Sequence, residues 1–245
     1  PAGSLLSQGN VAHDTDALPY QAQAALETLT TRRIAGEPLA YLTGHKEFYG
    51  LDLVVDDRVL DPRPDTETLV EWALEVLPST GPARVVDLGT GSGAIALALK
   101  ATRPNLNVVA VDYSSDALAV ARTNGQRLQL DVQCIQGSWL DAVPGRFAAI
   151  VSNPPYIRAD DSHLEALTHE PLQALASGHD GLDDIRRIVA QAPEHLEPGG
   201  WLLLEHGYDQ AADVRSMLQT AGFSQVQSRV DLAGIERCSG GSLPR

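Results

Sequence analysis

The sequence is poor in cysteine, in long apolar runs and in basic residues, and each shortage argues against a class of protein. Its two cysteines, Cys134 and Cys238, lie in apolar, strand-like stretches, which predicts buried reduced thiols rather than a disulfide framework. No cysteine or histidine group has the spacing of a metal site, so no metal is expected. No segment approaches the ~20 apolar residues of a membrane span, and residues 1–10 lack the basic and apolar parts of a signal peptide. We therefore expect a cytoplasmic protein that does not contact a membrane.

Lysine and arginine together number 18, against 32 aspartates and glutamates, and the net charge is −14. Proteins that bind nucleic acid usually present a basic face to the phosphates, so this charge disfavours a direct nucleic-acid partner and favours a basic protein partner. The length of 245 residues suggests one large domain, alone or with a small attachment.

Beyond residue 83, strand-like and helix-like segments alternate along the chain. We expect strands at 84–88, 108–111, 132–135, 147–151, 201–205, 224–230 and 236–239. We expect helices at 94–101, 115–128, 182–195 and 210–221. This alternation predicts an α/β fold with a Rossmann-like, mostly parallel sheet and helices on both faces. The last strand is expected to run antiparallel at the edge.

The first part of the chain has a different pattern. Apolar residues at helical spacing predict a helix over 15–36, and alternation with turn residues predicts a β-hairpin over 47–60. Asp65 is expected to cap a helix over 66–77. These elements suggest an N-terminal helical region, a β-hairpin linker and one large α/β domain, at residues 1–45, 46–62 and 63–245.

A glycine loop follows the strand at 84–88. Gly89, Gly91 and Gly93 allow a tight turn and a close ligand approach before a helix begins, and Asp112 ends the next strand, where it could accept hydrogen bonds from ribose hydroxyls. The pattern predicts an adenosine-containing cofactor, and a dinucleotide remains an alternative. The third glycine favours S-adenosylmethionine, as does Asp87, which could accept a hydrogen bond from the loop or from an ammonium group.

The fourth strand runs into Asn-Pro-Pro-Tyr at 153–156, where a parallel sheet binds its ligands. Two prolines supply carbonyl acceptors and no N–H donors. The side-chain oxygen of Asn153 and the carbonyl of Pro154 could accept both hydrogens of a planar NH₂ group and hold its nitrogen in front of a methyl group. Tyr156 offers a ring face for stacking. The motif therefore predicts methylation of an amide or exocyclic amino nitrogen.

Together, these two motifs resemble those of amino-group methyltransferases that act on adenine N6 in DNA, guanine N2 in RNA or glutamine N5 in proteins. Four further segments, at 36–44, 47–50, 62–67 and 202–207, are similar to the peptide chain release factor glutamine methyltransferases. A sister family that methylates a ribosomal protein glutamine typically has Pro-Arg-Ser-Pro where this chain has Pro-Arg-Pro-Asp-Thr-Glu. That activity, a nucleic-acid adenine-N6 or guanine-N2 methyltransferase and a non-catalytic cofactor-binding adaptor remain the alternatives.

The resemblance implies a class I methyltransferase domain, a helical N-terminal region that helps to dock class 1 release factors, and methylation of the glutamine in their Gly-Gly-Gln loop. A monomer is expected, and residues 158–181 are expected to form a lid over the substrate. The implied catalytic residues are Asn153, Pro154 and Tyr156. The implied substrate contacts are Asn153, Pro154, Pro155, Tyr156, Arg63 and Glu67. The expected cofactor contacts are Asp87, Gly89, Thr90, Gly91, Ser92, Gly93, Asp112, Asn153 and Trp139, the last against the adenine.

Overall fold

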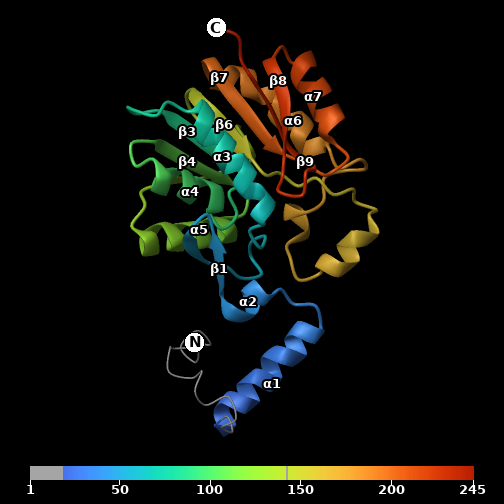
Figure 1. Cartoon of the computed structure of the whole chain (residues 1–245). Coiled ribbons are helices and arrows are strands. Elements are labelled where there is room, and N and C mark those ends of the chain that lie inside the picture. Colours follow the sequence, from blue (N-terminus) through green and yellow to red (C-terminus); the bar gives the residue numbers. More distant parts are fainter. Residues whose placement is uncertain (1–18, 142) are drawn as a thin grey trace.

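The computed structural model of the chain describes residues 19–141 and 143–245, and a seven-stranded sheet forms its centre (Figure 1). The strands are β3 (Arg84–Leu88), β4 (Asn107–Asp112), β5 (Gln133–Gln136), β6 (Phe147–Ser152), β7 (Leu196–Glu205), β8 (Ser224–Val230) and β9 (Glu236–Ser242). Their order across the sheet is β5-β4-β3-β6-β7-β9-β8, and only β9 runs antiparallel to its neighbours. The predicted α/β fold is confirmed. The expected edge position of β9 is wrong, because β9 inserts between β7 and β8 and bonds to both.

Successive residues of the inner strands pack on opposite faces of the sheet, as the two-residue period of a strand requires. Val85 belongs to the apolar core beneath α3 (Glu67–Val76), α4 (Ala94–Thr102) and α5 (Ser115–Leu128). Val86 belongs to the core beneath α6 (Asp183–His195) and α7 (Ala211–Thr220). Both valines are fully buried, and each such side chain contributes about 1.5–3 kcal/mol to folding. Helices therefore cover both faces, as predicted.

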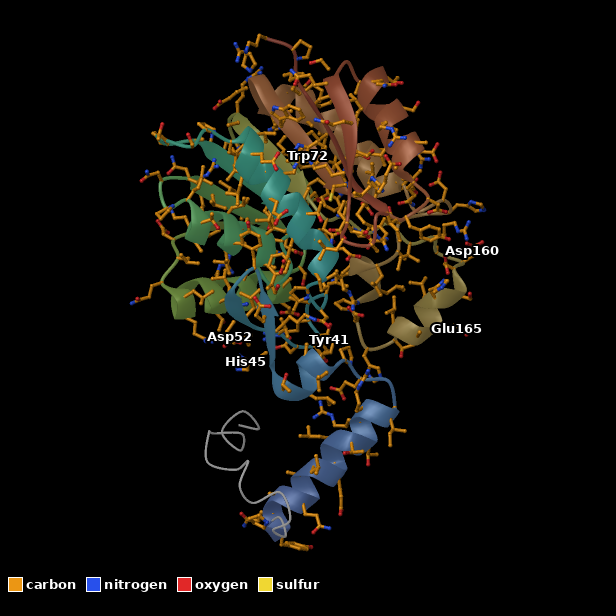
Figure 2. All side chains as sticks on the ribbon, in the orientation of Figure 1. Tyr41, His45, Asp52, Trp72, Asp160 and Glu165 are labelled. Carbon is orange, nitrogen blue, oxygen red and sulfur yellow. The ribbon has the colours of Figure 1, made fainter. Side chains whose placement is uncertain are left out.

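Trp72 anchors the helix α3 over the part of the sheet that contains β7 and β8, and Figure 2 labels this residue on the helix. Trp72 packs edge-on against Trp201 of β7, with ring centroids 6.2 Å apart, and the guanidinium of Arg229 on β8 lies 4.8 Å from its ring centroid. A short 3-10 turn, η3 (Pro64–Thr66), precedes α3. The predicted capping role of Asp65 is wrong: Pro64 begins the 3-10 turn earlier, and the carboxylate of Asp65 faces Arg237 at 3.6 Å.

The predicted hairpin is present but shorter than expected, with strands β1 (His45–Phe48) and β2 (Leu51–Val54). Tyr49 and Gly50 join them, both with positive φ, as a two-residue hairpin turn requires. Residues 55–60 are not a strand, because the chain turns at Asp56, whose carbonyl accepts the Val59 N–H (3.2 Å), and Val55 and Val59 on either side of the turn are each 1% exposed. Asn124 of α5 holds β2 in place by donating to the Val54 carbonyl (3.0 Å) and accepting from its N–H (2.8 Å).

Among the residues that the structure describes, two helices precede the hairpin, α1 (Tyr20–Ile34) and α2 (Leu39–Thr43). The helix α1 confirms the predicted helix over its described part, since residues 15–18 lie outside the described residues. It buries no residue and extends away from the sheet domain (Figure 1). The described residues include no helix that is long and apolar enough to cross a membrane. Both cysteines are free thiols, but only Cys238 is fully buried, because Cys134 lies on the partly exposed strand β5.

Candidate active site

The glycine loop between β3 and α4 is shaped by Asp87 from beneath. This carboxylate is fully buried and accepts hydrogen bonds from the Thr90 hydroxyl (2.6 Å) and from the N–H of Ala96 (3.2 Å). Burial raises the pKa of Asp87 to about 7, and the bond from Thr90 opposes that rise. Gly89, Gly91 and Gly93 all have positive φ. Asp87 therefore fixes a loop conformation that side chains rarely adopt.

Asp112, at the carboxyl end of β4, lies beside this loop. One carboxylate oxygen accepts the Gly91 N–H (2.9 Å), and the other accepts the Ser114 N–H (2.9 Å). Burial raises its pKa, and these backbone donors act in the opposite direction. The side chain is thus held in one orientation while it lines a cavity that can receive the two hydroxyls of a ribose.

A cavity of about 240 Å³, which we call the donor cavity, opens over the glycine loop. Among the residues lining it are Gly89, Gly91, Asp112, Tyr113, Trp139, Asn153, Pro155, Ala174 and Asp184. The Trp139 indole closes one side, with its N–H donating to Asp184 (3.1 Å). A Cβ added at Gly89 would lie 3.4 Å from this ring and 4.0 Å from the Asn153 carbonyl oxygen. The bare glycine leaves the space that a cofactor would fill.

A second cavity, of about 350 Å³, lies on the α3 side of the same sheet edge, and we call it the acceptor cavity. It is lined by Leu60, Arg63, Pro64, Asp65, Asn153, Tyr156, Ile157, Leu167, Ala174, Leu175, Glu205 and Arg237. Three residues line both cavities: Leu60, Asn153 and Ala174. The side chain of Asn153 therefore lies at the boundary between them.

Several contacts fix the conformation of the Asn-Pro-Pro-Tyr segment. The Asn153 side-chain NH₂ donates to the Thr66 hydroxyl at the start of α3 (3.2 Å). Tyr156 and Ile157 both donate their backbone N–H to the Leu175 carbonyl, at 3.2 and 2.9 Å. Burial raises the pKa of the Tyr156 phenol. The bond to Thr66 fixes which side of the Asn153 amide carries the nitrogen, and none of the hydrogen bonds among the described residues uses its amide oxygen, which is free to accept from a ligand.

Residues 158–181 cover both cavities, with two short 3-10 turns, η4 (Ser162–Leu167) and η5 (Leu172–Ala174). Asp160 and Glu165 mark this segment in Figure 2. Glu170 is buried, accepts hydrogen bonds from the Arg63 guanidinium and the Asp61 N–H, and so joins the segment to the chain before α3. This position agrees with a lid, and lid motion stays a prediction.

The structure brings most of the predicted site residues to the two cavities. They are Arg63, Gly89, Gly91, Asp112, Trp139, Asn153, Pro155 and Tyr156. The others line neither cavity: Asp87, Thr90, Ser92, Gly93, Pro154 and Glu67.

For five of the six predicted residues that line neither cavity, the contacts in the structure show a role in holding the loop, the helices or the hairpin. Asp87 and Thr90 bond to each other beneath the loop, and the Ser92 carbonyl accepts a hydrogen bond from Asn124 (2.9 Å). A Cβ at Gly93 would lie 3.3 Å from the Cβ of Ala121 on α5, so this glycine permits α5 to pack closely against the start of α4. Glu67 accepts the Tyr49 N–H in the hairpin turn (3.0 Å).

Three cavity residues were not predicted from the sequence, Tyr113, Glu205 and Arg237, and neither was Thr66, which lines neither cavity but contacts Asn153. Tyr113 follows the end of β4 and Glu205 ends β7, so the rule that ligands bind at the carboxyl ends of parallel strands could have found both. Thr66 lies in the segment 62–67 that carries the family resemblance, but that resemblance gives it no role, and no sequence signal marks Arg237.

This sheet order, a glycine loop after the first strand of the sheet and Asn-Pro-Pro-Tyr at the adjoining strand end define a class I S-adenosylmethionine-dependent methyltransferase. A methyltransferase from Pyrococcus furiosus has the same fold, with a TM-score of 0.62 at 19% identity over 92% of this chain and 99% of that one. A 16S rRNA N2 methyltransferase from Thermus thermophilus, in complex with AdoMet and guanosine, has a TM-score of 0.59 at 20% identity over 81% of this chain and 49% of that one.

Residues 66–179 match the family described as Methyltransferase small domain, and residues 8–44 match the PrmC N-terminal domain. The release factor glutamine methyltransferase of Bordetella pertussis is 50% identical over 95% of this chain and 88% of its own length. That of Pseudomonas aeruginosa is 52% identical over 90% of this chain and 81% of its own length. The chain belongs to the family of release factor glutamine methyltransferases.

The cofactor of this family is S-adenosylmethionine, which supplies a methyl group activated by a sulfonium. The residues of the donor cavity fit this molecule. In the bound state, Asp112 would accept hydrogen bonds from the ribose hydroxyls, Trp139 would pack against the adenine, and the space at Gly89 would hold the chain that carries the sulfonium.

Proposed function

We propose that this chain transfers the methyl group of S-adenosylmethionine to the side-chain amide nitrogen (N5) of the glutamine in the Gly-Gly-Gln loop of class 1 peptide chain release factors. The single observation that carries the proposal is the position of Asn153 between the donor and acceptor cavities, with its NH₂ group held by Thr66. Relatives named release factor glutamine methyltransferase support the choice of protein substrate.

An amide nitrogen is a weak nucleophile, because its lone pair is delocalised into the carbonyl group. The Asn153 side-chain oxygen can accept one of its hydrogens, and the carbonyl of the next residue, Pro154, accepts the other once the substrate is bound, although Pro154 lines neither cavity in the ligand-free chain. These two bonds orient the nitrogen and increase its electron density. None of the hydrogen bonds among the described residues uses the Pro154 carbonyl. Holding the two reactants in line can lower the barrier by several kcal/mol.

The charge of the chain supports a protein substrate over a nucleic acid. The net charge is −14, and Asp65 and Glu205 offset Arg63 and Arg237 around the acceptor cavity. A nucleic-acid base brings negatively charged phosphates with it, and the surroundings of the acceptor cavity have little net positive charge to neutralise them. A glutamine of a ribosomal protein has the same side-chain amide. Only an assay with both proteins as substrates can therefore distinguish between these two alternatives.

The test uses radiolabelled S-adenosylmethionine with a class 1 release factor, the same factor with the Gly-Gly-Gln glutamine changed to alanine, the ribosomal protein and a tRNA. We expect label only in the unaltered release factor. Asn153→Ala should lower the transfer rate about 10²–10³-fold, as removal of one preorganised polar contact does, and change cofactor affinity only slightly. Asn105→Ala, at an exposed position, is the matched control. Absence of label in the release factor with the wild-type chain would reject the assignment.

We further propose that the protein acts as a monomer in the cytoplasm. Residues of one chain line both cavities, so no second subunit is needed to complete the site. The proposed substrate belongs to the translation machinery, which accounts for the compartment. Sedimentation of the full chain at micromolar concentration should give the mass of one chain, 26.1 kDa.

A further inference from the structure

A buried carboxyl group in the acceptor cavity has no part in the mechanism described so far. Glu205, the last residue of β7, is 1% exposed. Its Oε2 atom has no hydrogen-bond partner among the described residues. Burying a carboxylate without full compensation costs several kcal/mol, so a carboxyl group in such a place calls for a functional explanation.

The sheet register places Glu205 beside Asn153. Ser152 of β6 pairs with Leu204 of β7, and Asn153 and Glu205 are the next residues of these neighbouring parallel strands, which lie about 4.8 Å apart. Val151 and Leu203, two residues earlier, pack in the same core cluster on the α3 face. Since side chains alternate along a strand, Asn153 and Glu205 both continue this face. Both line the acceptor cavity.

The charged and titratable groups around Glu205 come from three directions. Arg63 and Asp65 precede α3, Tyr156 follows β6, and Arg237 and Cys238 lie on β9. Burial raises the pKa of Glu205 to about 7, and the negative charge of Asp65 raises it further. The nearby hydroxyls of Thr66 and Tyr156 and the positive charge of Arg237 lower this pKa and so oppose the rise. A carboxyl group that titrates near neutrality can accept a proton and release it again.

We propose that the carboxylate of Glu205 accepts the proton that the substrate amide loses during methylation, an inference that rests on the proposed function. The amide nitrogen forms a bond to the methyl carbon as the carbon–sulfur bond breaks, and the electron pair of that bond goes to sulfur. The nitrogen then carries one positive charge and two hydrogens. The N–H proton that was bonded to the Asn153 oxygen passes to the neighbouring carboxylate of Glu205, which leaves a neutral N-methyl amide and a neutral carboxylic acid. The acid returns the proton to water after the product leaves.

This proton acceptor matters because a methylated amide that keeps both hydrogens is a strong acid that has lost its conjugation. Transfer of the proton as the carbon–nitrogen bond forms avoids the full cost of that cation. A positioned proton acceptor typically accelerates such a step 10²–10⁴-fold. A carboxylate also stabilises the positive charge that moves from the sulfonium to the nitrogen.

The experiment measures single-turnover methylation of a release factor at saturating cofactor, from pH 5.5 to 9. The wild-type rate should fall about tenfold from its plateau by pH 6. Glu205→Gln keeps the shape but cannot accept the proton, and it should lower the plateau at least 10²-fold and abolish this acidic limb. Glu205→Asp, which restores a carboxylate, should recover part of the rate together with the limb. The Kd for S-adenosylmethionine should change less than twofold, because Glu205 does not line the donor cavity.

Glu197→Gln, at the exposed opposite end of the same strand, is the matched control and should retain the wild-type rate and pH profile. Thermal unfolding with and without cofactor checks that each variant is folded. A Glu205→Gln variant with the wild-type rate and the same acidic limb would overturn the proposal, whereas a wild-type chain that fails to label the release factor would refute the proposed function instead.

Discussion

Thr66 offers a direct test of how the site orients its amide. Its hydroxyl accepts the hydrogen bond from the Asn153 side-chain NH₂ at 3.2 Å, and Thr66 is only 4% exposed. Replacing Thr66 with valine keeps the size of the side chain but removes the hydroxyl, so the Asn153 amide can rotate and present its NH₂ group to the substrate. Thr66 makes no side-chain capping bond to α3, which limits the effect on stability.

The expected loss follows from the contacts that disappear. A neutral hydrogen bond contributes about 1 kcal/mol, which corresponds to a roughly fivefold lower rate. Thr66→Val should therefore lower the single-turnover rate of methyl transfer by about fivefold, with the Kd for S-adenosylmethionine unchanged.

Thr66→Ser retains the hydroxyl and should restore most of the rate. Thr68→Val, on the same helix, is the matched control, because no hydrogen bond of the Thr68 hydroxyl connects it to the site in the described part of the chain. The reasoning would fail if Thr66→Val transferred the methyl group as fast as the wild type, or if Thr66→Ser were as slow as Thr66→Val.

Two further predictions concern stability. Asn124→Ala removes three buried hydrogen bonds, to Val54 and Ser92, and should lower the free energy of unfolding by about 2–4 kcal/mol in urea titrations; an unchanged midpoint would contradict the structural role of Asn124. The folded pKa of Asp87 lies above its unfolded value, so between about pH 4 and 7 the folded state binds more protons and stability falls as pH rises. Asp87→Asn should flatten that slope in thermal unfolding at several pH values, and an unchanged slope would assign it to another group.

Local pattern was sufficient to predict the elements that surround the donor cavity. The strand at Arg84–Leu88, the glycine loop and Asp112 lie within thirty residues of one another, and their spacing along the chain predicts how they lie relative to one another. The Asn-Pro-Pro-Tyr segment was equally visible, because two prolines after an apolar strand restrict the backbone strongly.

The remaining features depend on contacts between distant parts of the chain. The position of β9 between β7 and β8 follows from strand pairing that no local pattern encodes. Asn124 bonds to Val54, seventy residues earlier, and Asn153 to Thr66, eighty-seven residues earlier. The burial of Glu205 arises only after α3 packs over the sheet. A polar residue in a helix or at a strand end has too many possible partners for its role to be read from the sequence.

The shared wall between the two cavities has a kinetic consequence. Tyr113, 74% exposed, stands at the mouth of one cavity, and the partly exposed Arg63 stands at the mouth of the other. We therefore expect each reactant to enter its cavity independently of the other, with exchange of spent cofactor while the protein substrate stays docked. Initial-rate kinetics should then show a ternary complex in which either ligand arrives first.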